Sequence, residues 1–205
     1  MTKTMENLPA IISSIGTIIA AYFAYNQYTK NKLTDIKVTK LEAEQAEKQK
    51  RRSDNSAIVH GELWEVLHEL KADRVYIVQP HPLGNESMVS IYFESKRKGV
   101  ESMKPKIQNL KMSDIARFCQ LMASQLFTVI TDIDGQVEDR YARSLLGACG
   151  TSQVIIKRLS DNQHDWVGSI FCEFTHGQEI DLDVARASLH EAAQNIQYII
   201  PPFID

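Results

Sequence analysis

Cysteine is scarce in this chain, with three residues among 205 and no regular spacing between them. The odd count fits free thiols in a reducing compartment, with one disulfide plus a spare thiol as the alternative. Cys172 and His176 stand four residues apart, but a closed zinc site needs about four ligands, and no second close pair is present. Asp132, Asp134 and Glu138 lack the third early oxygen ligand of a calcium loop and predict a tight turn. We therefore expect no metal and no cofactor.

The chain also lacks an excess of positive charge and the short motifs of common enzymes. Its net charge is -3 and its pI about 6.1, so it has no broad basic surface for nucleic acid. No glycine-rich phosphate loop, serine triad or pair of catalytic carboxylates can be singled out. These absences predict a protein that is not an enzyme and does not bind nucleic acid.

Long apolar runs are absent after residue 25, but residues 8–25, LPAIISSIGTIIAAYFAY, contain no charge. As a helix they would measure about 27 Å, close to the hydrocarbon thickness of a bilayer. We therefore predict a transmembrane helix over 8–28, after an N-terminal tail over 1–7. A cleaved signal peptide is disfavoured because the small-x-small cleavage site is missing. A buried core helix is disfavoured because only Ser13, Ser14 and Thr17 are polar.

The residues around and within this run predict its orientation and its self-association. Four lysines follow the run closely and one precedes it, and positively charged flanks tend to stay in the cytoplasm. We therefore predict a single-pass membrane protein with its N-terminus outside and its C-terminal domain cytoplasmic. The following lysines are Lys30, Lys32, Lys37 and Lys40, and the preceding one is Lys3. Gly16, Ala20 and Ala24 form a stripe that would let two helices approach closely, although small residues are common in membrane spans. We expect a membrane partner and a homo-oligomer.

Residues 29–55 contain no glycine, proline or aromatic residue and are densely charged. The i,i+4 pairs Glu44–Lys48 and Glu47–Arg51 support a solvated helix, so we predict a charged helical linker, or stalk, over 29–55. Fewer than three good heptads are present, which disfavours a coiled coil. The remaining residues, 56–205, have a length that suits one soluble domain.

Hydrophobic periodicity divides residues 56–205 into helices and strands. We predict helices over 56–72, 113–126, 137–146 and 182–196, and strands over 75–78, 88–94, 127–131, 152–159 and 166–174. Ser113 and Asp181 are the expected N-caps of their helices. Pro80 and Pro82 predict a loop over 79–85, because proline is disfavoured in a central strand.

The last strand and the order of elements predict the layers of the fold. One face of 166–174 carries Trp166, Ile170, Cys172 and Phe174, and the other carries Val167 and Phe171. Both faces are substantially apolar, so the strand is expected to be covered on both sides. The order predicts an α+β fold with an antiparallel sheet. Its first and last helices pack on one face and its middle segments on the other.

This order resembles a GAF domain, a small-molecule and interaction module of sensory proteins. The resemblance rests on Ala72-Asp73-Arg74-Val75-Tyr76-Ile77, on GACGTSQVIIKRLSDNQHDWVGSIFCEF over 147–174, and on a closing helix over 182–200. It implies a GAF-like sensory or interaction module that binds a small ligand or a protein partner. The Asn-Lys…Phe…Asp-Glu signature of cyclic-nucleotide-binding members is incomplete, because no Asp-Glu dipeptide occurs, and the Cys-His dipeptide of bilin-binding members is missing. Both ligand classes are therefore disfavoured.

Two alternatives from other classes stay open at this point. The layout of apolar run, charged stalk and α/β body also resembles the single-span holins of large tailed phages. That resemblance implies a bacteriophage protein oligomerising in the membrane, with its body outside the inner membrane. The GAF fold also includes the free methionine sulfoxide reductase, a thiol enzyme, and Cys149 at a turn is the candidate nucleophile. The loop cysteines of that enzyme have no counterpart over 79–112.

A candidate ligand site follows from the second predicted strand. Ser90, Tyr92 and Glu94 alternate with apolar residues and are expected on one face, with His81 in the preceding loop and Tyr76 on the first strand. These groups would orient a polar ligand if that face lies under the middle segments. A partly solvated sheet face is the alternative.

Overall fold

The computed structural model describes residues 8–200, with the side chains of 8–21, 24, 33, 35, 48–49 and 51–52 left aside. The chain divides into two units, residues 1–51 and 52–205. The predicted tail over 1–7 lies outside the described residues, and so do the side chains of the small-residue stripe. The predicted domain boundaries at 28 and 55 stay predictions.

One helix, α1 (Leu8–Glu69), contains both the predicted transmembrane segment and the predicted helical linker. Among the residues that the structure describes, no helix is long and apolar enough to cross a membrane. A span needs about 20 mostly apolar residues, whereas the described part of α1 beyond Tyr28 carries a charge every few residues. This finding contradicts the predicted localisation as a single-pass membrane protein with an outside N-terminus and a cytoplasmic domain. Most side chains of the predicted span, residues 8–21, are not among those described.

The second unit is built on a six-stranded antiparallel sheet in the order β3-β2-β1-β6-β5-β4. After α1 its elements are β1 (Arg74–Leu83), β2 (Glu86–Lys96), β3 (Leu110–Lys111), η1 (Met112–Ile115), α2 (Ala116–Ser124), β4 (Phe127–Ile130), α3 (Ile133–Gln136), α4 (Arg140–Ala148), β5 (Gln153–Ser160), β6 (Trp166–Phe174) and α5 (Leu182–Ile196). We call residues 97–150, between β2 and β5, the excursion. The central strands β1 and β6 are distant in sequence and pair from Arg74↔Glu173 to Val78↔Ser169.

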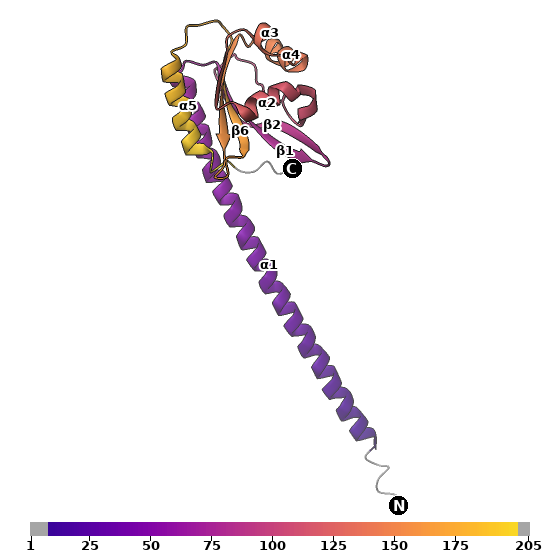
Figure 1. The fold of residues 1–205 in the computed structure, drawn as a ribbon. Helices are drawn as coiled ribbons and strands as arrows, with labels where there is room; N and C mark the ends of the chain where they lie inside the picture. The colour runs from indigo at the N-terminus through magenta and orange to yellow at the C-terminus, as the bar shows by residue number, and fades with distance from the viewer. Residues whose placement is uncertain (1–7, 201–205) are drawn as a thin grey trace, which may run out of the picture. The chain divides into compact units, whose positions relative to one another are not determined.

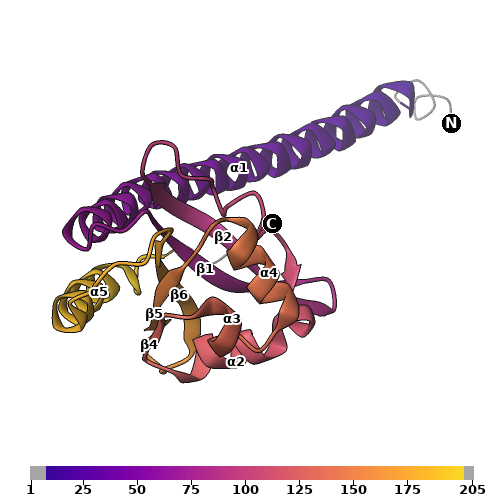
Figure 2. The same cartoon turned by 90° about the horizontal axis from the view of Figure 1, so that it is seen from above.

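Helices cover both faces of the sheet, as the sequence predicts. We call the second unit the body, and residues 52–69 the body part of α1. On one face, α5 lies beside the body part of α1. Leu63, Leu67 and Leu189 pack there on Ile77 and Ile170 of the sheet. On the other face lie α2, α3 and α4 of the excursion, which Figure 2 shows from above. The α+β fold with helices on both sides of an antiparallel sheet is therefore confirmed. The predicted hairpin of 152–174 and the helix over 182–196 are confirmed as well.

The two predicted helix caps have different outcomes. The Asp181 carboxylate accepts hydrogen bonds from the amides of Asp183 and Val184 and caps α5, as predicted. Ser113 lies inside the short 3-10 helix η1, and its hydroxyl bonds the neighbouring Asp114 carboxylate. The cap of α2 comes instead from a distant residue, because Asp139 accepts the amide of Phe118 at 2.6 Å.

The predicted loop over 79–85 is wrong, because β1 continues through both prolines to Leu83. Pro80 and Pro82 are paired with Val89 and Ser87 of β2. Pairing with β6 ends at Val78, so beyond that residue β1 has a neighbour on one side only. Proline is tolerated on such an edge because its missing N–H would face away from the neighbouring strand.

Trp166 and Val167 lie on the faces opposite to those predicted. A register shift separates Leu159↔Gly168 from Ser160↔Trp166, so one extra residue enters β6 near its start. Trp166 consequently packs toward the core under the excursion and Val167 toward the core under α1 and α5. A bulge of this kind moves every side chain before it to the other face.

Gly168 provides a test of how closely β1 and β6 pack. A Cβ atom at this position would lie 2.9 Å from the carbonyl oxygen of Val78, which belongs to the backbone and cannot move alone. We expect Gly168→Ala to lower the free energy of unfolding by about 1–3 kcal/mol in urea titrations. Gly61→Ala is the control, since no atom lies within 4 Å of its added Cβ in α1. It should raise stability by up to about 1 kcal/mol. Equal effects of the two changes would contradict the close contact.

Candidate functional site

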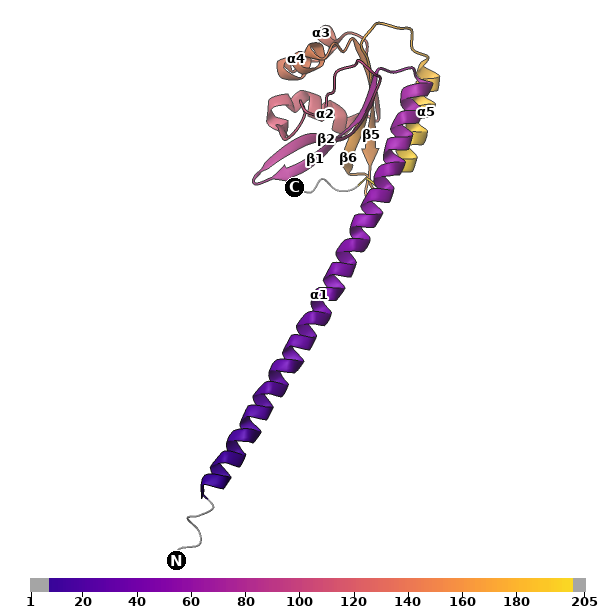
Figure 3. The same cartoon turned by 180° about the vertical axis from the view of Figure 1, so that it is seen from behind.

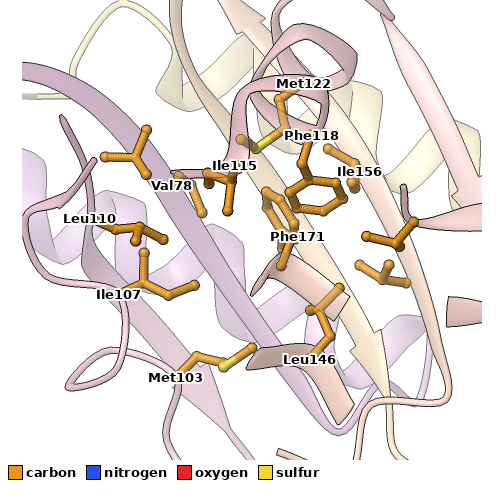
Figure 4. Close-up of a cluster of buried hydrophobic side chains, with 14 of the residues drawn as sticks. Val78, Met103, Ile107, Leu110, Ile115, Phe118, Met122, Leu146, Ile156 and Phe171 are labelled. Carbon is orange, nitrogen blue, oxygen red and sulfur yellow. The ribbon is translucent and has the colours of Figure 1, made fainter. Parts of the chain in front are cut away.

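A small apolar cavity lies between the sheet and the excursion, and it is the candidate ligand site of the fold. Its volume is about 20 Å³, and its walls come from β1, β2 and β6 on the sheet side and from the excursion on the other. Figure 4 shows Met103, Ile107 and Leu110 of the excursion in the same cluster as Phe118 and Phe171. A space of this size holds about one water molecule. The protein's own side chains therefore fill most of the site.

The sheet side of the cavity is aromatic. The rings of Tyr76 and Phe171, which are cross-strand neighbours on β1 and β6, stack with centroids 5.0 Å apart and planes 12° apart. The ring of Phe118 of α2 packs at a tilted angle on the ring of Phe171, with centroids 6.0 Å apart. Alternate strand residues point to the same face, so these strands present apolar side chains to the excursion. Apart from the Tyr76 hydroxyl, the lining offers no side-chain hydrogen-bonding group.

A buried polar network surrounds the Tyr76 hydroxyl. Arg74 and Glu173 form a fully buried ion pair, with the guanidinium Nε 2.9 Å from the carboxylate. Thr151 donates to the same carboxylate at 2.8 Å, and the Tyr76 hydroxyl donates to its second oxygen. Arg74 also donates to the carbonyl oxygen of Glu101 at 2.6 Å. Buried charges are tolerated when they are paired in this way, and the pairing leaves neither oxygen of Glu173 without a partner.

Burial has a clear effect on the phenol in this network. Tyr76 is completely buried, and burial, followed by the neighbouring charge of Glu173, raises its pKa well above the usual value. The hydroxyl therefore stays protonated and donates its hydrogen bond to Glu173 through the neutral pH range. Tyr76 is part of the core and orients Glu173 toward Arg74.

The structure does not bring the five predicted site residues together. Tyr76 and Glu94 are cross-strand partners on the cavity face, but a bulge between Tyr76 and Val78 puts Ser90 opposite Gln79, on the other face. Ser90 Oγ lies 2.9 Å from His81 Nε2 and accepts a hydrogen bond from the backbone N–H of Asn109 at 2.7 Å. The expectation that Ser90, Tyr92 and Glu94 share one face is therefore wrong.

Glu94 and Tyr92 have local contacts in this structure. The Glu94 carboxylate accepts hydrogen bonds from the Ser102 hydroxyl and from the amide of Met103, the latter at 2.7 Å, and so holds the start of the excursion. Tyr92 is 38% exposed, and Lys104 Nζ lies 5.2 Å from its ring centroid. A ligand-binding role for these two residues, and for Tyr76, His81 and Ser90, stays a prediction.

Arg74, Thr151 and Glu173 are the polar residues at this site that the sequence interpretation missed. One signal was available, since Glu173 stands within a strand that is apolar on both faces. A carboxylate in such a strand requires a buried cation or several donors. The partner is 99 positions away, and no local pattern identifies it.

The three cysteines are free and buried. Burial, with a smaller contribution from Asp139, raises the pKa of the Cys119 thiol to about 12. Burial, with the charges of Glu173 and Asp73, raises the pKa of Cys172 further. A thiol enzyme needs an accessible thiolate, and the predicted nucleophile Cys149 is only 5% exposed, so nothing here supports the alternative of a methionine sulfoxide reductase. Within the described part of the chain, no three His, Cys, Asp or Glu residues are grouped as metal ligands would be.

Comparison with known proteins identifies the fold. No protein-family model and no curated protein matches the chain. Among solved structures, the GAF domain of the cyanobacteriochrome TePixJ has a TM-score of 0.57 and 11% identity over 71% of this chain and 88% of that one. The phycoerythrobilin-bound GAF domain of a cyanobacterial phytochrome has a TM-score of 0.55 and 15% identity, over 74% and 87%. The third GAF domain of Slr1393 from Synechocystis has a TM-score of 0.55 and 15% identity, over 70% and 90%.

The fold is GAF-like. These neighbours are GAF domains of a cyanobacteriochrome and of a cyanobacterial phytochrome. Their low identity restricts the likeness to the fold, and the chromophores belong to those proteins. The bilin-binding Cys-His dipeptide remains missing from this chain.

The ion pair can be tested by removing its carboxylate. Glu173→Ala leaves the Arg74 guanidinium buried without its counter-charge, and we expect a loss of about 3–5 kcal/mol in the free energy of unfolding. Urea titration followed by circular dichroism measures it. Glu101→Ala removes an exposed carboxylate paired with Lys106 and should leave the midpoint nearly unchanged. Similar losses of unfolding free energy in the two variants would show that the buried ion pair stabilises the fold no more than an exposed one.

The cysteine environment predicts slow thiol chemistry in the folded protein. Because their raised pKa values keep Cys119 and Cys172 protonated, iodoacetamide at pH 8 should alkylate both far more slowly in buffer than in urea. Mass spectrometry of timed samples resolves each site. Alkylation of Cys172 in the folded protein at its rate in urea would contradict its complete burial in the core.

Proposed function

We propose that this chain is a non-catalytic, GAF-like sensory or interaction module that binds a small, mainly apolar ligand between the sheet and the excursion. The observation that carries the proposal is the small apolar cavity at that place. GAF-like neighbours that are sensory domains support the general class. Holin-like oligomerisation in a membrane has no supporting observation among the described residues and is not carried forward.

The lining restricts the class of ligand. The polar groups nearest the cavity are already paired with one another, so a charged phosphate or carboxylate would find no free partner there. A ligand larger than one water must also displace side chains of the excursion. Met103 and Met122 line the cavity, and methionine adapts its shape to an incoming group more easily than branched residues do.

Self-association and a protein partner belong to the same proposal. Ile58 and Trp64 lie on the body part of α1, and they are 49% and 53% exposed. Exposed apolar side chains on a helix support contact with a second copy or another protein. Displacement of the excursion would reach α1 through the sheet, because α1 packs on the opposite face.

A ligand screen on the full chain tests the proposal. A compound at about 100 times its Kd should stabilise the protein by roughly 2.7 kcal/mol, which thermal unfolding detects. We expect small apolar compounds to stabilise it and nucleotides to have no effect. The methyl signals of Met103 and Met122 should shift on binding.

Two matched variants locate the ligand. Ala142 lines the cavity, so Ala142→Leu should fill it and abolish the stabilisation. Ala187 is exposed on α5, so Ala187→Leu should leave ligand binding intact. Stabilisation that persists in Ala142→Leu, or the absence of any stabilising apolar compound, would contradict the proposed site.

A further inference from the structure

A second concave site lies outside the cavity, at the edge of the body where β1 extends beyond β6. It is an open cleft of about 480 Å³. Its walls come from Gln79–Pro82 of β1, from the turn between β5 and β6 with the start of β6, and from the segment that follows α5. It shares no lining residue with the apolar cavity. Unlike the cavity, the cleft has room for a small molecule without displacement of side chains.

Two aromatic rings contribute to the cleft. Trp166 is partly buried, and its indole Nε1 donates to Ser169 Oγ at 3.0 Å, which fixes the orientation of the ring. Tyr198 follows the end of α5 and is 60% exposed, so most of its ring is available to a ligand. Aromatic faces attract cations because their π-electrons carry negative charge. The cleft therefore offers two surfaces suited to a positively charged group.

The charge of the cleft points to the same ligand class. Among the described residues that line it, Asp161 is the only carboxylate, and none is lysine or arginine. Asp161 Oδ1 accepts the amides of Gln163 and Asp165, both at 2.8 Å, so the turn holds the carboxylate in place. Arg158 in the same hairpin donates to the carbonyl oxygen of His164 and does not line the cleft. An anionic ligand would meet Asp161 with no cation in the lining to offset it.

His81 and Gln79 form a buried part of the lining. Both residues are at most 5% exposed. His81 is fixed by Ser90 at 2.9 Å and contacts the carbonyl oxygen of Pro82 at 3.4 Å. Small-molecule sites combine such fixed polar groups with apolar walls, which Pro80, Val167 and Ile200 supply here.

We propose that this cleft binds a small organic cation, with an ammonium group near Asp161 and an apolar or aromatic body against Trp166 and Tyr198. The proposal is independent of the ligand in the apolar cavity. It assigns to His81 a place in a ligand site, separate from Tyr76 and Glu94.

Phenethylamine and phenylacetate are matched probes, because they share a ring and a similar length and differ in charge. We would titrate each into the full chain carrying Trp64→Phe, so that Trp166 is the only fluorescent indole. Saturable change of Trp166 emission by phenethylamine, at least about tenfold tighter than by phenylacetate, is the expected result. Equal binding of the two probes, or no saturation by the amine, would overturn the proposal.

Variants separate the charge from the rings. Asp161→Asn keeps an oxygen for the two turn amides, so it should fold and yet weaken phenethylamine binding at least about threefold. Tyr198→Leu should weaken it to a similar degree. Asp114→Asn removes an exposed carboxylate from η1, outside the cleft lining, and is the control with unchanged affinity. Affinity that is the same in Asp161→Asn, Tyr198→Leu and the control would show that the amine binds elsewhere.

Discussion

The buried ion pair of Arg74 and Glu173 joins two strands of the body that are 99 positions apart in sequence. It lies across β1 and β6, the two central strands, and its guanidinium also bonds Thr151 and the carbonyl oxygen of Glu101. Those last two residues stand near the two ends of the excursion. Since each charge is costly to bury alone, correct strand pairing and docking of the excursion depend on each other. The apolar cavity between the sheet and the excursion exists because both conditions are met.

Much of the body could be predicted from local patterns. Leu63, Leu67 and Leu70 repeat at helical spacing, which predicts a helix. Apolar and polar residues alternate in the two segments of 152–174 on either side of a polar turn, which predicts two paired strands. Asp181 caps its helix through bonds to residues two and three positions away, which a local motif can predict. The cap of α2 comes from Asp139, 21 positions away, and no local motif contains it.

The candidate site was harder to predict because bulges alter the alternation of strands. Ser90 and Glu94 are an even number apart and would share a face in a regular strand, but the bulge beside Tyr76 separates them. The bulge near the start of β6 likewise puts Trp166 and Val167 on the faces opposite to those predicted. His81 lines the open cleft only because β1 continues through Pro80 and Pro82. Prolines usually end a strand, so the sequence predicted a loop there. The sequence predicted a site for a polar ligand under the middle segments, whereas the cavity found there has an almost entirely apolar lining.

The prolines of β1 have a further consequence for the behaviour of the protein at high concentration. A strand edge with free N–H groups can pair with the edge of another molecule and start an aggregate. Past Val78, β1 leaves such an edge uncovered by β6. Pro80 and Pro82 carry no N–H, so this edge offers fewer donors to an incoming strand. The residues that obscured the strand in the sequence therefore also protect it from intermolecular β-pairing.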